Sequence, residues 1–416
     1  MQFKTSYQIP ASLCIKCRAA KNLCGLSYCP ILVQTMTMPK LQKPISNQVS
    51  GSSPPSIFVG RFGYPKIKIY PSTPPQFGET TSYENPPDWL KMDLEAFLSM
   101  RLSIIRGGME ISVKDASRPD KNLGDAQLLS MAYKPVDMEM TFDRSMANSK
   151  IILSEYTPPM GPSSPIRSIS YGNIKIDNPV ERAFNDTDLK ANDAVISLYA
   201  NGIDVSRLSK ILSTGSIGVS HNRRAVPTRW SITAIDKNVS DRNVSIIKQY
   251  ESVDKYEVFI RQTPGNLFMA IMAPGNWQFE WGEAWFPGST WNTFGTDSAV
   301  EIDSEQYGGR KDYPGIGGCY YASRLAVSEY LLKRRRMAIP MLWREIYPGF
   351  NLPVGVWYVR ENLREMFRSS PLVFEDLQSS LSFLSKYMKI PVQKWLSKSS
   401  IYRYLRSVTL DRFVMK

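Results

Sequence analysis

Several features that are common in proteins of this size are scarce or missing from the 416-residue chain. It has one histidine, His221, so mechanisms that need a histidine pair are excluded, including that of the H-E-x-x-H metalloproteases. It contains no GxxxxGK[ST] phosphate loop, no GxGxxG dinucleotide fingerprint and no GxSxG nucleophile elbow. The standard NTPase, dinucleotide-fold and serine-hydrolase mechanisms therefore find no support in the sequence.

Long apolar runs are also missing. No segment approaches the roughly 20 consecutive apolar residues that span a bilayer, and the opening residues MQFKTSYQIPASLC lack the apolar core of a signal peptide. At 43% hydrophobic and 11% aromatic residues, the chain can nevertheless bury a substantial core. We expect a cytoplasmic protein of two or three domains with no membrane partner.

Acidic residues are nearly absent from the two ends of the chain. Residues 1–50 contain six Lys or Arg and no Asp or Glu, and residues 377–416 contain eight Lys or Arg and one acid, Asp411. These ends therefore account for the whole net charge of +13, and 51–376 is formally neutral. A neutral body with two basic ends suits a protein that touches a polyanion with its extremities. The alternative is that the basic ends only aid solubility.

Four of the five cysteines lie close together in the sequence, as Cys14-x2-Cys17-x6-Cys24-x4-Cys29. Without a secretion signal, a disulfide framework is disfavoured. Four thiolates satisfy Zn²⁺ completely and predict one structural zinc ion, while an iron–sulfur cluster is the alternative that the same ligands allow. The remaining thiol, Cys319, is predicted to be a small buried hydrophobic residue.

Composition divides the chain into four parts. Residues 1–38 hold the cysteines, and residues 39–56, rich in Pro, Ser and Gly, are typical of a linker. Residues 57–376 are predicted to form a mixed α/β body, with a division near 215–225 that would give two subdomains. Residues 377–416 are predicted to be a basic helical segment that ends in a short flexible tail. The predicted class is α+β.

Hydrophobic periodicity places the main elements within these parts. Strands are expected over 57–71 and in a β-rich centre between about 226 and 303, where RWSITAID, EVFIRQ, LFMAIMA and WQFEWGEAWF are aromatic and β-branched runs. Helices are expected over 88–105, 188–202, 318–336, 359–368 and 374–388.

Two segments combine polar groups with aromatic residues. Arg229 and Arg310 could hold phosphate. Glu283 could act as acid or base, and Asp312 could orient an arginine or bind a metal. The neighbouring tryptophans could stack on a base. These residues would have to converge in one cleft. The alternative is a buried Arg–Glu pair in a β-rich core, with the tryptophans as packing.

Eight segments in order along the chain carry a specific pattern. They are LCGLSYCPI (23–31) with the C-x2-C before it, FVGRFGYP (58–65), NPPDW (85–89), GPSSPI (161–166), VPTRWSITAID (226–236), WGEAWFPGS (281–289), GGRKDYPGIGGCYYASRLA (308–326) and LPVGVWYVRE (352–361). Together they resemble the archaeal Nre DNA-repair proteins, close to the NreA type. The resemblance implies an archaeal, nucleoid-associated protein with a four-cysteine zinc module and a C-terminal motif that binds the sliding clamp (PCNA). It supplies no catalytic residue.

The C-terminus SVTLDRFVMK fits that clamp-binding motif in part. The motif requires a Gln, an aliphatic residue three positions after it, and two aromatic residues six and seven positions after it. Leu410 and Phe413 match, whereas Ser407 replaces Gln and Val414 replaces the second aromatic. A short turn would place Leu410 and Phe413 on one side as a hydrophobic plug. The substitutions should weaken affinity for the clamp.

These observations favour a DNA-repair factor that binds DNA and is recruited to the sliding clamp. Two other interpretations stay open: an enzyme acting on a nucleotide or a damaged DNA end, and an RNA-associated zinc protein.

Overall fold

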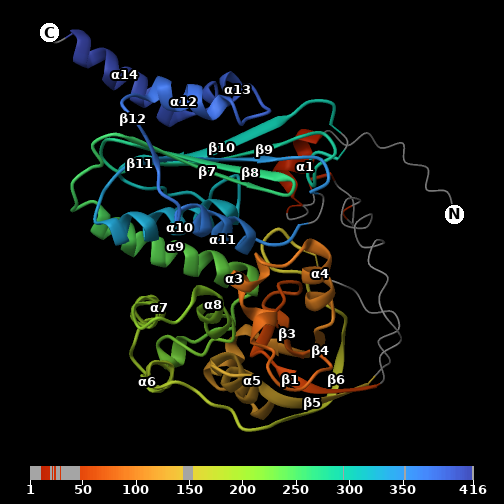
Figure 1. Cartoon of the computed structure of the whole chain (residues 1–416). Coiled ribbons are helices and arrows are strands. Elements are labelled where there is room, and N and C mark those ends of the chain that lie inside the picture. The colour runs from red at the N-terminus through yellow and green to blue at the C-terminus, as the bar shows by residue number, and fades with distance from the viewer. Residues whose placement is uncertain are drawn as a thin grey trace. The chain divides into compact units, whose positions relative to one another are not determined.

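Two compact units make up the chain, and each is built around one six-stranded sheet. The computed structural model describes residues 11–18, 21, 23, 24, 29, 47–143, 153–293, 295–350 and 353–414. The first-sheet unit comprises 39–239 and 354–358, and the second-sheet unit comprises 1–38, 240–353 and 359–416. The mixture of helices and strands confirms the predicted α+β class (Figure 1).

The sheet of the first-sheet unit has the order β1-β5-β6-β4-β3-β2. Its neighbouring strands pair antiparallel except β4 and β6, which run parallel. Aliphatic residues on these strands pack on α5, with Ile69, Met140 and Leu129 fully buried. The strands are β1 (Gln48–Ser53), β2 (Ser56–Val59), β3 (Lys66–Thr73), β4 (Ile105–Ser112), β5 (Val136–Phe142) and β6 (Ser163–Tyr171).

Three helices of the first-sheet unit begin at aspartates that cap them. The carboxylates of Asp93, Asp120 and Asp204 each accept a backbone N–H from the first turn of α4, α5 and α8, respectively. The helix expected over 88–105 is therefore two helices, because Asp93 starts a new one. The elements are α3 (Pro86–Trp89), α4 (Leu94–Leu102), α5 (Lys121–Met131), α6 (Asn178–Asn185), α7 (Ala191–Ala200), α8 (Val205–Ser213), and the short 3₁₀ turns η1 (Thr81–Glu84), η2 (Val113–Ser117) and η3 (Ser220–Asn222).

The range 39–56, predicted as a linker, contains strand β1 and the start of β2. Its small residues serve close packing: a Cβ on Gly51 would meet the Pro74 carbonyl oxygen at 2.0 Å. Ser52, Ser53 and Ser56 in this range are buried. Their hydroxyls are hydrogen-bonded; that of Ser53, for example, donates to the Ser72 carbonyl at 2.7 Å. A Ser- and Gly-rich composition marks this strand because it lacks room for larger side chains.

The sheet of the second-sheet unit has the order β10-β9-β11-β8-β7-β12. Strands β8, β9 and β11 are buried along their whole length, as expected for inner strands covered on both faces. The strands predicted from EVFIRQ, LFMAIMA and WQFEWGEAWF are confirmed as β7, β8 and β9. The bounds are β7 (Tyr256–Thr263), β8 (Asn266–Ala273), β9 (Phe279–Trp285), β10 (Ala299–Glu305), β11 (Ile339–Ile346) and β12 (Leu372–Phe374).

Helices cover both faces of this sheet. Figure 1 shows α10 and α11 along one face and α12, α13 and α14 along the other. The helices predicted at 318–336, 359–368 and 374–388 are confirmed as the first three of this series. The bounds are α10 (Gly318–Arg334), α11 (Trp357–Met366), α12 (Leu377–Ser385), α13 (Val392–Leu396) and α14 (Ser400–Val414).

One predicted strand is wrong. RWSITAID lies in helix α9 (Thr228–Ile247). The boundary between the first-sheet unit and the second-sheet unit falls within this helix, between residues 239 and 240. Over this full length the buried residues Ser231, Ile235, Val239 and Ile247 recur at helical spacing. A window of eight residues contained too few turns to show that period, and its β-branched residues favoured a strand. The division of the chain thus lies later than the expected 215–225.

The C-terminus also differs from the prediction, because α14 is helical as far as Val414 where a short flexible tail was expected. Among the residues that the structure describes, no helix is both long and apolar enough to cross a membrane.

Candidate functional site

Cys14 lies within electrostatic reach of the other three clustered cysteines. Cys14 and Cys17 lie three residues apart on α1 (Ala11–Cys17), which places both on one side of the helix. The pKa of Cys14 is raised to about 11, first by burial and then by Cys29, Cys17 and Cys24. The Leu23 N–H donates to Cys17 Sγ at 3.4 Å. Thiols that repel one another as thiolates suit a divalent cation, whose charge removes that repulsion.

Arg18 fastens this cysteine helix to the second sheet. Its guanidinium lies 3.3 Å from Glu283 Oε2 and 4.5 Å from the ring centre of Trp285, and both of these residues are on β9. It also donates to the carbonyls of Ile15 and Ile316. Arg18 is only 5% exposed. In the sequence, Arg18 counts among the basic residues of an end that is predicted to bind a polyanion. In the structure it is instead a buried residue that anchors α1 to the sheet.

Glu283 is part of a buried ion-pair network. Its carboxylate lies between Arg18 and Arg344, whose guanidinium is 3.2 Å from Glu283 Oε1. Arg344 stands opposite Glu283 in the parallel β9–β11 pair and donates twice to Asn266 Oδ1, at 2.7 and 2.9 Å. The buried carboxylate is therefore paired with a cation on each side within the β-rich core.

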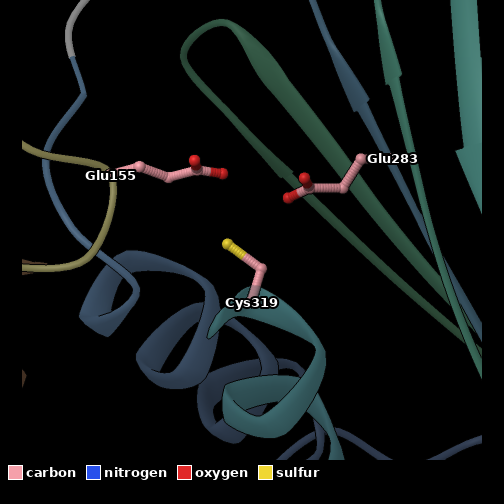
Figure 2. Close-up of side chains that lie close together, drawn as sticks. All are labelled: Glu155, Glu283 and Cys319. Atoms are coloured by element: carbon pink, nitrogen blue, oxygen red, sulfur yellow. The ribbon is translucent and has the colours of Figure 1, made fainter. Parts of the chain in front are cut away.

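The thiol of Cys319, at the start of α10, lies within 4.8 Å of the Glu283 carboxylate. Figure 2 shows these two side chains directed toward each other from helix and strand. Glu155, which Figure 2 also labels, belongs to the first-sheet unit. Cys319 is 4% exposed, which confirms its predicted burial.

Arg310 and Asp312 share one loop, and Arg310 holds that loop in place. Its guanidinium lies 2.9 Å from Asp303 Oδ1 and donates to the carbonyls of Ser304, at 2.8 Å, and Asp312, at 3.4 Å. Asp312 itself is exposed. The contact between Arg310 and Asp312 thus uses the backbone of Asp312.

Arg229 lies in the first turn of α9, in the first-sheet unit. Its guanidinium is centred 3.7 Å over the ring of Tyr156. Of the four residues considered for catalysis, the structure brings Arg310 and Asp312 together and gives Glu283 other partners. The convergence of Arg229 with Glu283 stays a prediction, since the two belong to different units.

Two buried glutamates that the sequence analysis missed join the C-terminal helices to the second sheet. Glu280 on β9 accepts hydrogen bonds from Trp343 Nε1 at 2.9 Å, Ser399 Oγ at 2.8 Å and the Ile401 N–H at 3.4 Å. Burial raises its pKa above the ordinary value. Ser399 and Ile401 flank the start of α14, so this carboxylate fixes where that helix begins.

Glu345 on β11 plays the same part for the turn between α12 and α13. It accepts the N–H groups of Lys389 and Ile390, at 2.9 and 3.1 Å, and the hydroxyl of Tyr347 at 2.8 Å. Burial raises the pKa of this carboxyl as well. A sequence signal for both glutamates exists, because each is an acid inside a strand made mostly of apolar and aromatic residues.

The predicted clamp motif lies in the last turns of α14. Ile401 and Leu405 are buried on this helix, and Ser407 is exposed. The other three motif positions, Leu410, Phe413 and Val414, follow on helical backbone; their side chains lie outside the described residues. At 3.6 residues per turn, positions 407, 410 and 414 fall on one side of the helix.

Comparison with known proteins identifies relatives along most of the chain. The family model for the N-terminal part of archaeal Nre matches residues 23–292, and the model for its C-terminal part matches 305–413. DNA repair protein NreB of Archaeoglobus fulgidus is 41% identical over 96% of this chain and 100% of the relative. Two proteins named DNA repair protein NreA are also similar. That of A. fulgidus is 35% identical over 92% of this chain and 95% of the relative. That of Haloferax volcanii is 31% identical over 87% of this chain and 88% of the relative. No solved structure matches the chain.

Proposed function

The chain belongs to the archaeal Nre family of DNA-repair proteins, and from this membership we propose a separate role in repair for each of three parts of the chain. The basic ends contact DNA, the end of α14 docks on the sliding clamp, and the four-cysteine module holds a structural zinc ion. The single observation that carries the repair role is the family match over both halves of the chain.

Exposed cations near both ends support the DNA contact. Lys16 on α1 and Lys21 after it are exposed, and so are Arg403 and Arg406 on α14. Phosphate contacts of this kind give an affinity that falls steeply with salt. Arg18 is excluded from this role because it is buried against Glu283.

Substitution of Lys16 and Lys21 by Gln tests the DNA contact in the full-length protein. Deletion of residues 1–50 would be a blunter test, since it also removes Arg18 and part of β1. We expect binding to duplex DNA to weaken and the log–log salt slope to shrink by about 2, close to 0.9 per lost phosphate contact. Lys333→Gln on α10, which removes an exposed positive charge outside the two ends of the chain, serves as the control. DNA binding that is absent at low salt would refute this part, and single-stranded RNA that outcompetes DNA would favour the RNA alternative.

The cysteine module supports the metal assignment through its donor set. Cys14, Cys17, Cys24 and Cys29 would hold the ion, and bound zinc would supply a cross-link between α1 and the segment after it. We expect one zinc per chain by metal analysis of purified protein, and its loss in Cys24→Ser. Iron with visible absorbance would identify a cluster instead, and metal-free folded protein would end the assignment.

The position of α14 supports the clamp contact. Glu280 and Glu345 fix the C-terminal helices on the second sheet, so the last turns of α14 extend from an anchored base. Leu410 and Phe413 would enter the hydrophobic groove of a clamp as a plug.

Calorimetric titration of the full-length protein with the organism's clamp tests this contact. The double substitution Leu410→Ala and Phe413→Ala should abolish measurable binding, because two anchor residues carry most of the energy of such a motif. Tyr404→Ala is the matched control, since Tyr404 is an exposed aromatic residue on the same helix outside the motif. Binding that survives the double substitution would exclude the motif.

A further inference from the structure

The loop between β2 and β3 is short and held on both sides. Gly63 has a φ of 84° in this loop, a conformation that favours glycine. The Lys66 N–H donates to the Gly63 carbonyl at 2.9 Å and closes the turn. At the loop's base, the Val59 N–H donates to Thr228 Oγ1 at 2.8 Å, which joins β2 to the first turn of α9. Side chains on this loop therefore have a fixed backbone beneath them.

This fixed loop and the first turn of α9 expose three aromatic side chains. Phe62 is 82% exposed and Tyr64 is 54% exposed, and the Tyr64 ring lies 5.4 Å from that of Trp230. Trp230 is 44% exposed, whereas each of the other eight tryptophans of the chain is at most 4% exposed. A protein that buries its other tryptophans so thoroughly leaves this one exposed to water beside the Tyr64 ring.

Two arginines accompany these rings. The guanidinium of Arg61 lies 5.0 Å from the ring centre of Phe62, and that of Arg229 lies 3.7 Å over Tyr156. The two cations are close enough to repel each other: the pKa of Arg61 is lowered first by burial and then by Arg229. Lys66, exposed at the start of β3, adds further positive charge. An anion that reached this surface would relieve the repulsion between the arginines.

We propose that Arg61, Phe62, Tyr64, Arg229 and Trp230, together the Trp230 surface, bind unpaired nucleotides of single-stranded DNA. The rings would stack on bases, and the arginines would hold the phosphates between those bases. This inference deepens the DNA-binding part of the proposed function and rests on it. It adds a contact that duplex DNA cannot make, because the base faces in a duplex are already stacked on each other.

The combination of side chains favours this ligand over the other partners. A groove reader of duplex DNA presents long polar side chains to base edges, whereas flat exposed rings meet base faces. A protein partner would instead bring carboxylates to Arg61 and Arg229, and the substitutions at this surface would then leave single-strand binding unchanged. Sequence preference is expected to be weak, since every base has a π-face.

Fluorescence anisotropy of a labelled oligothymidine with the full-length protein tests the proposal. Phe62→Ala and Trp230→Ala should each weaken single-strand binding about tenfold, the loss expected for one stacked base. Binding to a duplex should change by less than about twofold, because phosphate contacts at the chain ends do not involve these rings. Trp230→Phe keeps an aromatic plane and should retain most of the affinity. It should also remove the component of tryptophan emission that single-stranded DNA quenches in the wild-type protein.

The control is the double substitution Phe77→Ala and Tyr133→Ala, which removes two other exposed aromatic side chains of the same unit. It should leave single-strand binding unchanged. Duplex binding with no effect of Phe62→Ala or Trp230→Ala on single strands would overturn the Trp230 surface and leave the proposed function intact. A wild-type protein that binds neither form of DNA would overturn both. Tighter binding of an oligouridine, with the same losses in the variants, would overturn the choice of DNA.

Discussion

Two pairs of arginines, one pair in each unit, are arranged in opposite ways. In the second-sheet unit, Arg18 and Arg344 are buried and share one carboxylate, Glu283. In the first-sheet unit, Arg61 and Arg229 lie near each other among aromatic rings, and they repel. The first arrangement places two cations around one buried carboxylate, and the second leaves two half-exposed cations near each other. The same residue type is thus a structural anchor in one unit and a candidate ligand contact in the other.

The largest expected effect is on stability, from Glu283→Gln. This change leaves Arg18 and Arg344 buried without their anion, so we expect the free energy of unfolding to fall by about 3–5 kcal/mol. Chemical denaturation of the full-length protein measures it. Glu301→Gln on the neighbouring strand, directly opposite in register, is the control and should cost less than about 0.5 kcal/mol. Equal effects of the two would show that Glu283 is not the centre of a buried network.

A smaller effect separates the arginines themselves. Arg18→Ala should lower the free energy of unfolding by about 2 kcal/mol, since it removes a charged hydrogen-bonding group while Glu283 keeps Arg344. Arg61→Ala should lie within about 0.5 kcal/mol of the wild-type protein, because it also relieves repulsion with Arg229. The same denaturation series measures both. A cost for Arg61→Ala as large as that for Arg18→Ala would remove the distinction between the units.

The pH dependence of stability should also differ between the units. Burial raises the pKa of Glu280 and Glu345 in the second-sheet unit. Between the ordinary and the raised pKa the folded state binds more protons than the unfolded chain, so stability falls as pH rises through that window. In the first-sheet unit burial acts on Glu84 as well, but Arg101 and Lys210 outweigh it and lower the pKa. The contribution of the Glu84 carboxylate to the free energy of unfolding is therefore lost as the pH falls through this lowered pKa.

Denaturation over a pH series checks these signs. Each carboxyl changes the free energy of unfolding by at most about 1.4 kcal/mol per pH unit. Glu280→Gln should flatten the loss on raising the pH above about 4.5, the ordinary value for glutamate. Glu84→Gln should reduce the loss of stability that the wild-type protein shows as the pH falls into the acid range. A steeper alkaline-side loss in Glu280→Gln would contradict the assignment.

The smallest expected effect belongs to the Trp230 surface. Phe62→Ala should change the free energy of unfolding by less than about 0.5 kcal/mol, because the Phe62 ring is 82% exposed and fills no core space. Thermal unfolding followed by circular dichroism is sufficient to measure it. A loss of several kcal/mol would mean that the ring is structural, contrary to the binding role.

The sequence predicted the elements that are strongly periodic and missed the contacts between distant segments. The helix starting at Gly318 was recognisable because it is long and periodic. The run LFMAIMA was recognisable because it is an unbroken apolar stretch bounded on each side by Pro and Gly. The run RWSITAID was predicted as a strand because its β-branched residues favour strands. Its helical period becomes visible only over the whole range 228–247. The contact of Arg18 with Glu283 joins residues far apart in sequence, and no local pattern could indicate it.

Composition likewise could not separate the two roles of tryptophan. Trp230 and Trp281 each follow or precede charged residues in aromatic segments, and both were considered for stacking. Exposure distinguishes them, since Trp281 is fully buried. Exposure depends on the tertiary packing around each ring, which neither residue's sequence neighbours specify.

The anchoring of α1 by Arg18 has a consequence for biosynthesis. The cysteine helix leaves the ribosome before its partner strand β9, which emerges only after residues 39–239 of the first-sheet unit have been made. The other face of the same sheet stays uncovered until α12, α13 and α14 follow. The first-sheet unit can therefore fold while the chain is still growing, whereas the second must wait for both of its ends. During that interval the four thiols are available to metal ions and to oxidants alike.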